Sequence, residues 1–127
     1  MKLRFRENSL RLRLNRGEAE ALAAGATLEE RVQFPGDARI LYVLETTTKL
    51  KAEAWFRDGV IGVSTPETQV KEWAAGESVG MYFELAAGGS VLKIAVEKDL
   101  ECVDGPAEER DPDAFPRTRP CTSSIAD

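Results

Sequence analysis

Arginines near the start of the chain carry the clearest chemical signal in the sequence. Arg4 and Arg6, and then Arg11 and Arg13, alternate with apolar residues. A period of two places both side chains of a pair on one face of a β-strand. Guanidinium groups gathered in this way can bind phosphate or carboxylate groups through paired hydrogen bonds. The sequence therefore predicts an anion-binding surface made by these four arginines, with Lys98 of a later strand beside them.

Two carboxylates could add a metal ion to this surface. Glu97 and Asp99 lie near the end of the last expected strand, and carboxylate oxygens are ligands for divalent cations. In this alternative the protein is an enzyme whose arginines grip a phosphorylated ligand while the two carboxylates hold the metal. The other interpretation is that Glu53, Glu84 and Glu97 form cross-strand ion pairs with the arginines. We favour the ion pairs and keep Glu97 and Asp99 as the metal candidates of the alternative.

The composition excludes several catalytic chemistries. The chain has no histidine, which removes the commonest general base, the serine–histidine and cysteine–histidine pairs, and most imidazole metal sites. Cys102 and Cys121 lack the C-x-x-C spacing of zinc and thioredoxin-type sites, so we expect two reduced thiols. Glycine pairs such as Gly88-Gly89 precede strands, whereas phosphate-binding loops open helices. We therefore expect no cofactor, and a non-catalytic binding or interaction module as the leading function.

The net charge of -5 conceals two segments of opposite sign. Residues 1–16 carry six basic residues and one acidic residue, whereas residues 97–113 carry eight acidic residues and two basic ones. The segments either attract each other in the fold, or the basic one meets an external anion. An acidic chain suits nucleic acid poorly, and only Trp55 and Tyr82 could stack on bases from polar strand faces. We expect an anionic small molecule or a protein as partner.

The first strand region changes phase in its middle. Leu3 and Phe5 place apolar side chains on odd positions, whereas the apolar residues of 10–14 occupy even ones. Either a β-bulge or a tight turn at Asn8-Ser9 explains the change. The hairpin would set arginine opposite arginine on the neighbouring strand, which is destabilising. We therefore favour one bulged strand, in which the cations still share a face.

The remaining pattern predicts an α+β fold. One helix is capped by Asn15 with Glu18 and stopped by Gly25; a second is capped by Thr65 and stopped by Gly76. Strands are expected at 28–34, 39–45, 52–57, 60–64, 79–85 and 92–96. The predicted order is β-α-β-β-β-β-α-β-β, in a mostly antiparallel sheet of six to seven strands. Each half has one short helix among antiparallel strands, which hints at an internal duplication.

The length of 127 residues fits a single domain. We place it at 1–102 and expect the proline-rich, acidic residues 103–127 to form an extended arm, docked near Phe115 and frayed at its end. No apolar run suits a secretory signal or a membrane span. We therefore expect a cytoplasmic protein without a membrane partner.

Two stretches resemble the signature ends of a family of small bacterial proteins of unknown function. They are MKLRFRENSLRLRL at residues 1–14, and EKDLEC with DPDAFP at 97–102 and 111–116. The resemblance implies that the basic strand and the acidic arm belong to one unit in a stand-alone cytoplasmic protein. It carries over no catalytic residue.

Overall fold

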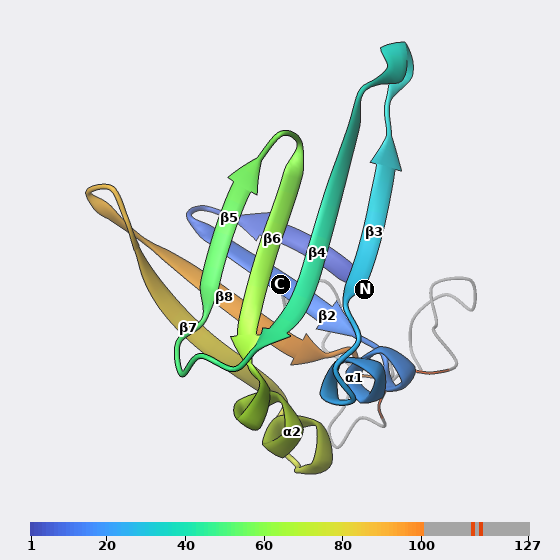
Figure 1. Cartoon of the computed structure of the whole chain (residues 1–127), viewed down its shortest axis with the longest axis vertical. Coiled ribbons are helices and arrows are strands. Elements are labelled where there is room, and N and C mark those ends of the chain that lie inside the picture. The colour runs from blue at the N-terminus through green and yellow to red at the C-terminus, as the bar shows by residue number, and fades with distance from the viewer. Residues whose placement is uncertain (101–112, 114, 116–127) are drawn as a thin grey trace.

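The computed structural model describes residues 1–100, 113 and 115. Its strands form two four-stranded sheets that cross each other, and its two helices lie together at one end of both (Figure 1). The elements in chain order are β1 (Lys2–Arg6), β2 (Ser9–Leu14), α1 (Arg16–Ala23), β3 (Leu28–Gln33), a 3-10 turn (Pro35–Asp37), β4 (Arg39–Thr47), β5 (Glu53–Arg57), β6 (Val60–Pro66), α2 (Glu67–Ala75), β7 (Gly80–Ala87) and β8 (Ser90–Lys98).

Each sheet consists of two antiparallel hairpins joined by a central parallel pair. Sheet A has the order β1-β2-β8-β7, with β2 parallel to β8, and sheet B has the order β3-β4-β6-β5, with β4 parallel to β6. The α+β class and the two helices are confirmed. The single, mostly antiparallel sheet of six to seven strands is wrong, because each hairpin pairs in parallel with one other hairpin, β2 with β8 and β4 with β6, and the eight strands therefore divide between two sheets.

The start of the chain is a hairpin, and the predicted bulge is wrong. β1 and β2 pair around a two-residue turn at Glu7-Asn8, where Glu7 has a positive φ of 51°. This register sets Arg4 directly opposite Arg11. The like charges are tolerated because β8 pairs with the other edge of β2 and brings the Glu97 carboxylate to the Nε of Arg11, at 3.1 Å.

The helix ends follow local chemistry. Asn15 caps α1 in a complete capping box with Glu18, and Gly25 adopts a φ of 97° just after the helix, as predicted. α2 begins without a side-chain cap, because its N-cap residue is Pro66. The predicted cap, Thr65, lies one residue earlier on β6, where its hydroxyl donates to the Glu45 carbonyl at 3.3 Å.

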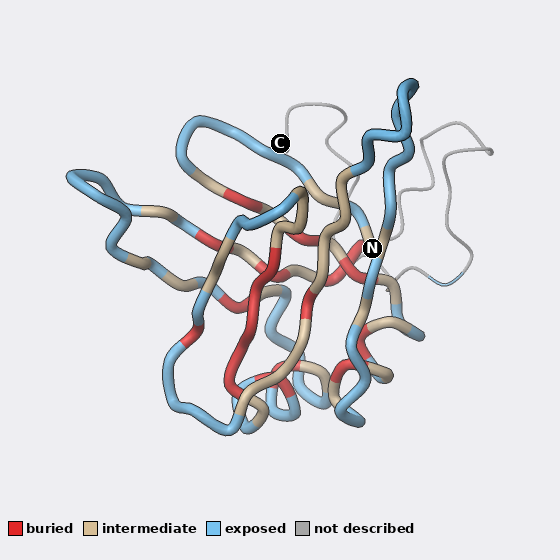
Figure 2. The backbone as a smooth tube through the Cα atoms, turned by 45° about the horizontal axis from the view of Figure 1, so that its top comes forward, coloured by how far each residue is buried: buried red, intermediate tan, exposed pale blue. Residues whose placement is uncertain are grey.

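The core lies between the sheets and extends to the helices, while the hairpin tips are exposed (Figure 2). On β2 the even-numbered leucines are buried and the odd-numbered residues are only partly covered, since successive side chains of a strand point to opposite faces. The odd-numbered residues therefore belong to the outer face of sheet A. The buried core consists of Leu10, Leu12, Leu14, Ala19, Leu22, Leu44, Val63, Val70, Trp73, Met81, Ile94 and Val96.

The topology repeats in the two halves of the chain. Each half consists of a hairpin, a helix and a second hairpin. A shift of 51 residues along the chain superposes the start of α1 at Arg16 on the start of α2 at Glu67. The same shift superposes the turn residue Glu7 on Asp58, and both have a positive φ of 51°. Sheet A combines the first hairpin of the first half with the last hairpin of the second, and sheet B combines the other two. Positions on the two sheets can therefore be compared one by one.

Candidate functional site

The outer face of sheet A concentrates positive charge. Strand pairing aligns the outward residues in rows across all four strands, and one such row is Arg4, Arg11, Ala95 and Tyr82. With Asp99 just beyond β8, the face has three carboxylates against six basic side chains, a surplus of three positive charges in a chain whose net charge is -5. We call it the basic face; its charged residues are Lys2, Arg4, Arg6, Arg11, Arg13, Glu84, Lys93, Glu97 and Asp99.

Glu97 organises the centre of the basic face. Its carboxylate lies 3.1 Å from Nε of Arg11 and 3.8 Å from Nε of Arg13, and accepts a hydrogen bond of 2.8 Å from the Tyr82 hydroxyl. Burial lowers the pKa of Arg13, and the Glu97 carboxylate opposes that shift. Burial, followed by the hydrogen bond to Glu97, raises the pKa of Tyr82. At neutral pH the face therefore presents charged guanidinium groups and a protonated phenol.

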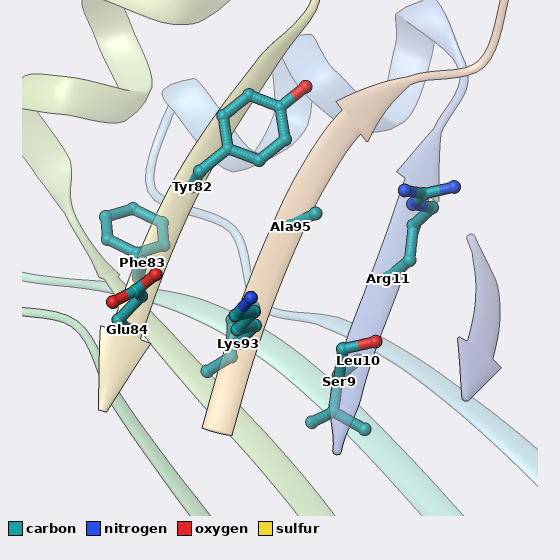
Figure 3. Close-up of a pocket in the computed structure, with 9 residues that line it drawn as sticks. Ser9, Leu10, Arg11, Tyr82, Phe83, Glu84, Lys93 and Ala95 are labelled. Carbon is teal, nitrogen blue, oxygen red and sulfur yellow. The ribbon is translucent and has the colours of Figure 1, made fainter. Parts of the chain in front are cut away.

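A pocket of about 230 Å³ opens on this face (Figure 3). Arg11 and Tyr82 stand on either side of Ala95, whose methyl group leaves a hollow between them. Glu84 and Lys93 lie along the same face, one on each of two neighbouring strands. The pocket thus combines cations, a carboxylate and an aromatic ring.

Lys98 does not join the four predicted arginines. It follows Glu97 on β8 and faces the opposite way, where it is 7% exposed. Its Nζ donates to the Gly76 carbonyl at 2.7 Å and lies 5.7 Å from the ring centre of Trp73 and 5.1 Å from that of Phe115. Burial lowers the pKa of Lys98. The Lys98 ammonium therefore binds the backbone carbonyl at the end of α2 and does not contribute to the anion-binding candidates on the basic face.

The two metal candidates contact cations. Glu97 is held by arginines as described above, and Asp99 lies 2.7 Å from Nζ of Lys2. Within residues 1–100, 113 and 115, no group of three or more acidic, histidine or cysteine side chains is arranged to hold a metal ion. Cys102 and Cys121 lie outside the described residues.

Two residues of the expected arm are described, and both contact the domain. Asp113 accepts from the amides of Arg16 and Gly17 at 2.8 Å each, through its carbonyl and its carboxylate. The amide of Phe115 donates to the Asp99 carbonyl at 2.8 Å, and its ring packs against the core cluster. The remaining arm residues, 103–112, 114 and 116–127, lie outside the described part of the chain.

Sheet B shows that the fold does not require this charge. Because the two sheets have the same topology, Arg11, which pairs with Ala95, corresponds to Gly62, which pairs with Val43. Among the basic positions only Arg6 has a basic counterpart, Arg57. The others, Lys2, Arg4, Arg11, Arg13 and Lys93, correspond to Glu53, Trp55, Gly62, Ser64 and Leu41.

Three contributors to the face are not among the residues predicted from the sequence. Lys2 shares the face of Arg4 and Arg6 by alternation along β1, whereas Lys93 and Ala95 become neighbours of the arginines only through the parallel pairing of β2 with β8. Period-two alternation indicates which side of a strand a residue takes, and it indicates nothing about which strand lies alongside. Alternation was a signal for Lys2, which precedes Leu3, and for Lys93, which precedes the buried Ile94.

These features define an α+β domain with two mixed sheets, one of which has an arginine-rich outer face. The chain belongs to a family of unknown function, DUF7009, whose model matches residues 1–119. No curated protein and no solved structure matches the chain. Of the helices in the described residues, neither is long and apolar enough to cross a membrane.

Proposed function

We propose that this protein is a non-catalytic binding module whose basic face holds an anionic ligand through phosphate or carboxylate groups. The observation that carries the proposal is the comparison between the sheets: the same topology is built twice, and five of six basic positions on sheet A are not basic on sheet B. The arginines are thus not a requirement of the fold.

The register of the face supports the same proposal. Arg4 lies opposite Arg11 and Lys2 lies opposite Arg13, and like charges at directly opposed positions destabilise a sheet. Functional sites are where a protein keeps residues that oppose its own stability. Glu97 and Asp99 offset part of this repulsion. An anion bound between the two strands would offset more of it and would gain charge-assisted hydrogen bonds.

The alternative, an enzyme with a divalent metal, has less support. Glu97 would have to give up its contacts with Arg11, Arg13 and Tyr82 to coordinate a cation. Asp99 would likewise have to leave Lys2. Binding of an anion requires neither rearrangement, so the geometry favours the binding module.

Isothermal titration at low ionic strength with inorganic phosphate, pyrophosphate and citrate tests the proposal. We expect binding that weakens as salt is added and a rise in Tm with ligand concentration. The double variant Arg4→Gln with Arg11→Gln should bind at least about tenfold more weakly, since hydrogen bonds to charged groups contribute about 1.5–3 kcal/mol each. Arg57→Gln, on sheet B, is the matched control and should bind as the wild type does. Absence of binding to all three anions would contradict the proposal.

A further inference from the structure

The basic face offers an aromatic ring beside its arginines. Tyr82 is 62% exposed, although its hydroxyl is fixed by Glu97 at 2.8 Å. The phenol end of the ring lies against Gly80, where a methyl group would come within 2.7 Å of Oη and 2.8 Å of Cζ. A ring that is anchored at its polar end and open to solvent can stack on a planar ligand with little loss of side-chain entropy.

The Tyr82 ring and Arg11 already share one small anionic group, the Glu97 carboxylate, which contacts the Tyr82 hydroxyl and Nε of Arg11. Tyr82 lies on β7 and Arg11 on β2, with β8 between them. Neighbouring strands are about 4.8 Å apart, so about 10 Å separates the two backbones. Because Glu97 occupies the place where one anionic group contacts both side chains, its negative charge would keep a phosphate at Arg11 away from the Tyr82 hydroxyl. A ligand that uses both must carry a planar ring at one end and an anionic group at the other, with its middle over Ala95.

Other polar residues of the basic face can contact the part of such a ligand that lies between its ring and its anionic group. Glu84 is two residues from Tyr82 on the same outward side of β7, where its carboxylate can accept hydrogen bonds from hydroxyl or amino groups. Lys93 lies opposite Glu84, and Arg4 lies beyond Arg11 on β1, so positive charge continues away from the ring.

We infer that the ligand is a free nucleoside phosphate, its base stacked on Tyr82 and its phosphate at Arg11 and Arg4. This inference rests on the proposed anion-binding function and names the ligand class for the same site. We favour a free nucleotide over a nucleic-acid strand because, of the two rings that line the pocket, Tyr82 and Phe83, only Tyr82 lies on the outer face, and because the chain as a whole is acidic, at -5.

Titration calorimetry with adenosine 5′-monophosphate, ribose 5-phosphate and a tetra-adenylate strand tests the inference. Stacking of a base on an aromatic ring contributes about 1–3 kcal/mol, so the mononucleotide should bind about tenfold more tightly than ribose 5-phosphate. A tetra-adenylate that binds more than about tenfold more tightly than the mononucleotide would overturn the choice of a free nucleotide.

Variants of Tyr82 separate the ring from the charge. Tyr82→Ala should lower affinity for the mononucleotide to that for ribose 5-phosphate and leave the latter unchanged, whereas Tyr82→Phe should keep the tenfold preference. Trp55→Ala removes an aromatic from sheet B and serves as the control. Ala95→Leu fills the hollow between Arg11 and Tyr82 and changes no charge. This variant should weaken binding of the mononucleotide at least as strongly as Tyr82→Ala.

The outcomes distinguish this inference from the function on which it rests. If ribose 5-phosphate and the mononucleotide bind equally well, or if Tyr82→Ala keeps the preference, the nucleotide is wrong and anion binding still stands. If none of these ligands binds and inorganic phosphate, pyrophosphate and citrate also fail, the proposed function and the inference are both wrong.

Discussion

The Tyr82 hydroxyl donates a 2.8 Å hydrogen bond to the Glu97 carboxylate, and this single contact joins the aromatic side of the basic face to its cationic side. Glu97 lies at the same time 3.1 Å from Nε of Arg11. The carboxylate therefore both neutralises a positive charge and fixes the ring. A change at Glu97 should affect stability and affinity in opposite directions.

Replacing Glu97 by glutamine tests this double role. Glu97→Gln leaves the hydrogen-bonding shape but removes the charge that Arg11 and Arg13 share, so we expect a loss of about 1 kcal/mol in the free energy of unfolding. Affinity for phosphate should rise several-fold, because the surplus of positive charge increases. Urea unfolding and calorimetric titration measure the two effects. Glu84→Gln is the control: Glu84 lies opposite Lys93 and not opposite an arginine, so its loss should lower the free energy of unfolding by less. An unchanged phosphate affinity in Glu97→Gln would count against the role assigned to Glu97.

Gly80→Ala should disturb the ring without altering any charge. The added methyl would come within 2.7 Å of Tyr82 Oη and 2.9 Å of Glu97 Cγ, so the ring must move. We expect the tenfold preference for the mononucleotide to disappear while affinity for ribose 5-phosphate stays within about twofold. Gly89→Ala is the control, since no atom beyond its chain neighbours lies within 4 Å of the added methyl. Full retention of the preference in Gly80→Ala would mean that the ring position is unimportant.

Because of Lys98, we expect the free energy of unfolding to increase as the solution becomes alkaline. Burial lowers the pKa of Lys98 from its usual 10.5, so the unfolded chain holds this proton more tightly than the folded protein does. Below the lowered pKa the penalty for burying the charge is present in full. As pH rises from the lowered pKa toward 10.5, the folded state loses its proton first and is stabilised relative to the unfolded state.

The variant Lys98→Met isolates this effect, because it keeps the length of the side chain and cannot titrate. The free energy of unfolding of the wild type minus that of the variant should increase between pH 7 and pH 10 in urea titrations. Tyr42 and Tyr82 also ionise in alkaline solution, and burial raises the pKa of both. Both proteins contain these tyrosines, so the subtraction removes their contributions. A flat difference across this range would show that the ammonium of Lys98 is as well solvated in the folded state as in water.

Phe115→Ala tests the docking of the arm, which remains a prediction. The Phe115 ring packs on the core cluster, 5.1 Å from Nζ of Lys98 and 5.7 Å from Cζ of Arg16. Because the ring is only partly buried, we expect a loss of about 1–3 kcal/mol, below the range for a fully buried phenylalanine. Thermal unfolding measures it, with Phe56→Ala as control, because Phe56 is 74% exposed. Equal Tm values for Phe115→Ala and the wild type would contradict docking.

Local chemistry was predictable wherever a few adjacent residues decide it. The Asn15–Glu18 capping box, the left-handed Gly25 and the Asp58-Gly59 hairpin turn all follow from interactions within a handful of residues. The prediction that Lys98 lies beside the arginines is wrong, and alternation along its own strand already indicates the opposite face. Ile94 and Val96 are buried on β8, and period two puts Lys98 on their side.

Sheet partnership was not predictable in the same way. The outward position of Glu97 on a strand predicts cross-strand ion pairs with the arginines, and those with Arg11 and Arg13 are confirmed. Alternation does not indicate that β2 and β8 lie side by side and parallel, which is what brings these residues together. The repulsion between Arg4 and Arg11 on the two strands of the hairpin, taken alone, favours a bulge. The third strand supplies the carboxylate that makes the hairpin acceptable.

The crosswise assembly of the sheets also sets an order of events in folding. The strands of sheet B lie within residues 28–66, so that sheet can form from one continuous stretch of chain. Sheet A must bring Ser9–Leu14 beside Lys93–Lys98, and closing such a long loop is slow because its entropy is lost before the contacts form. We therefore expect the basic face to form late in folding, after sheet B.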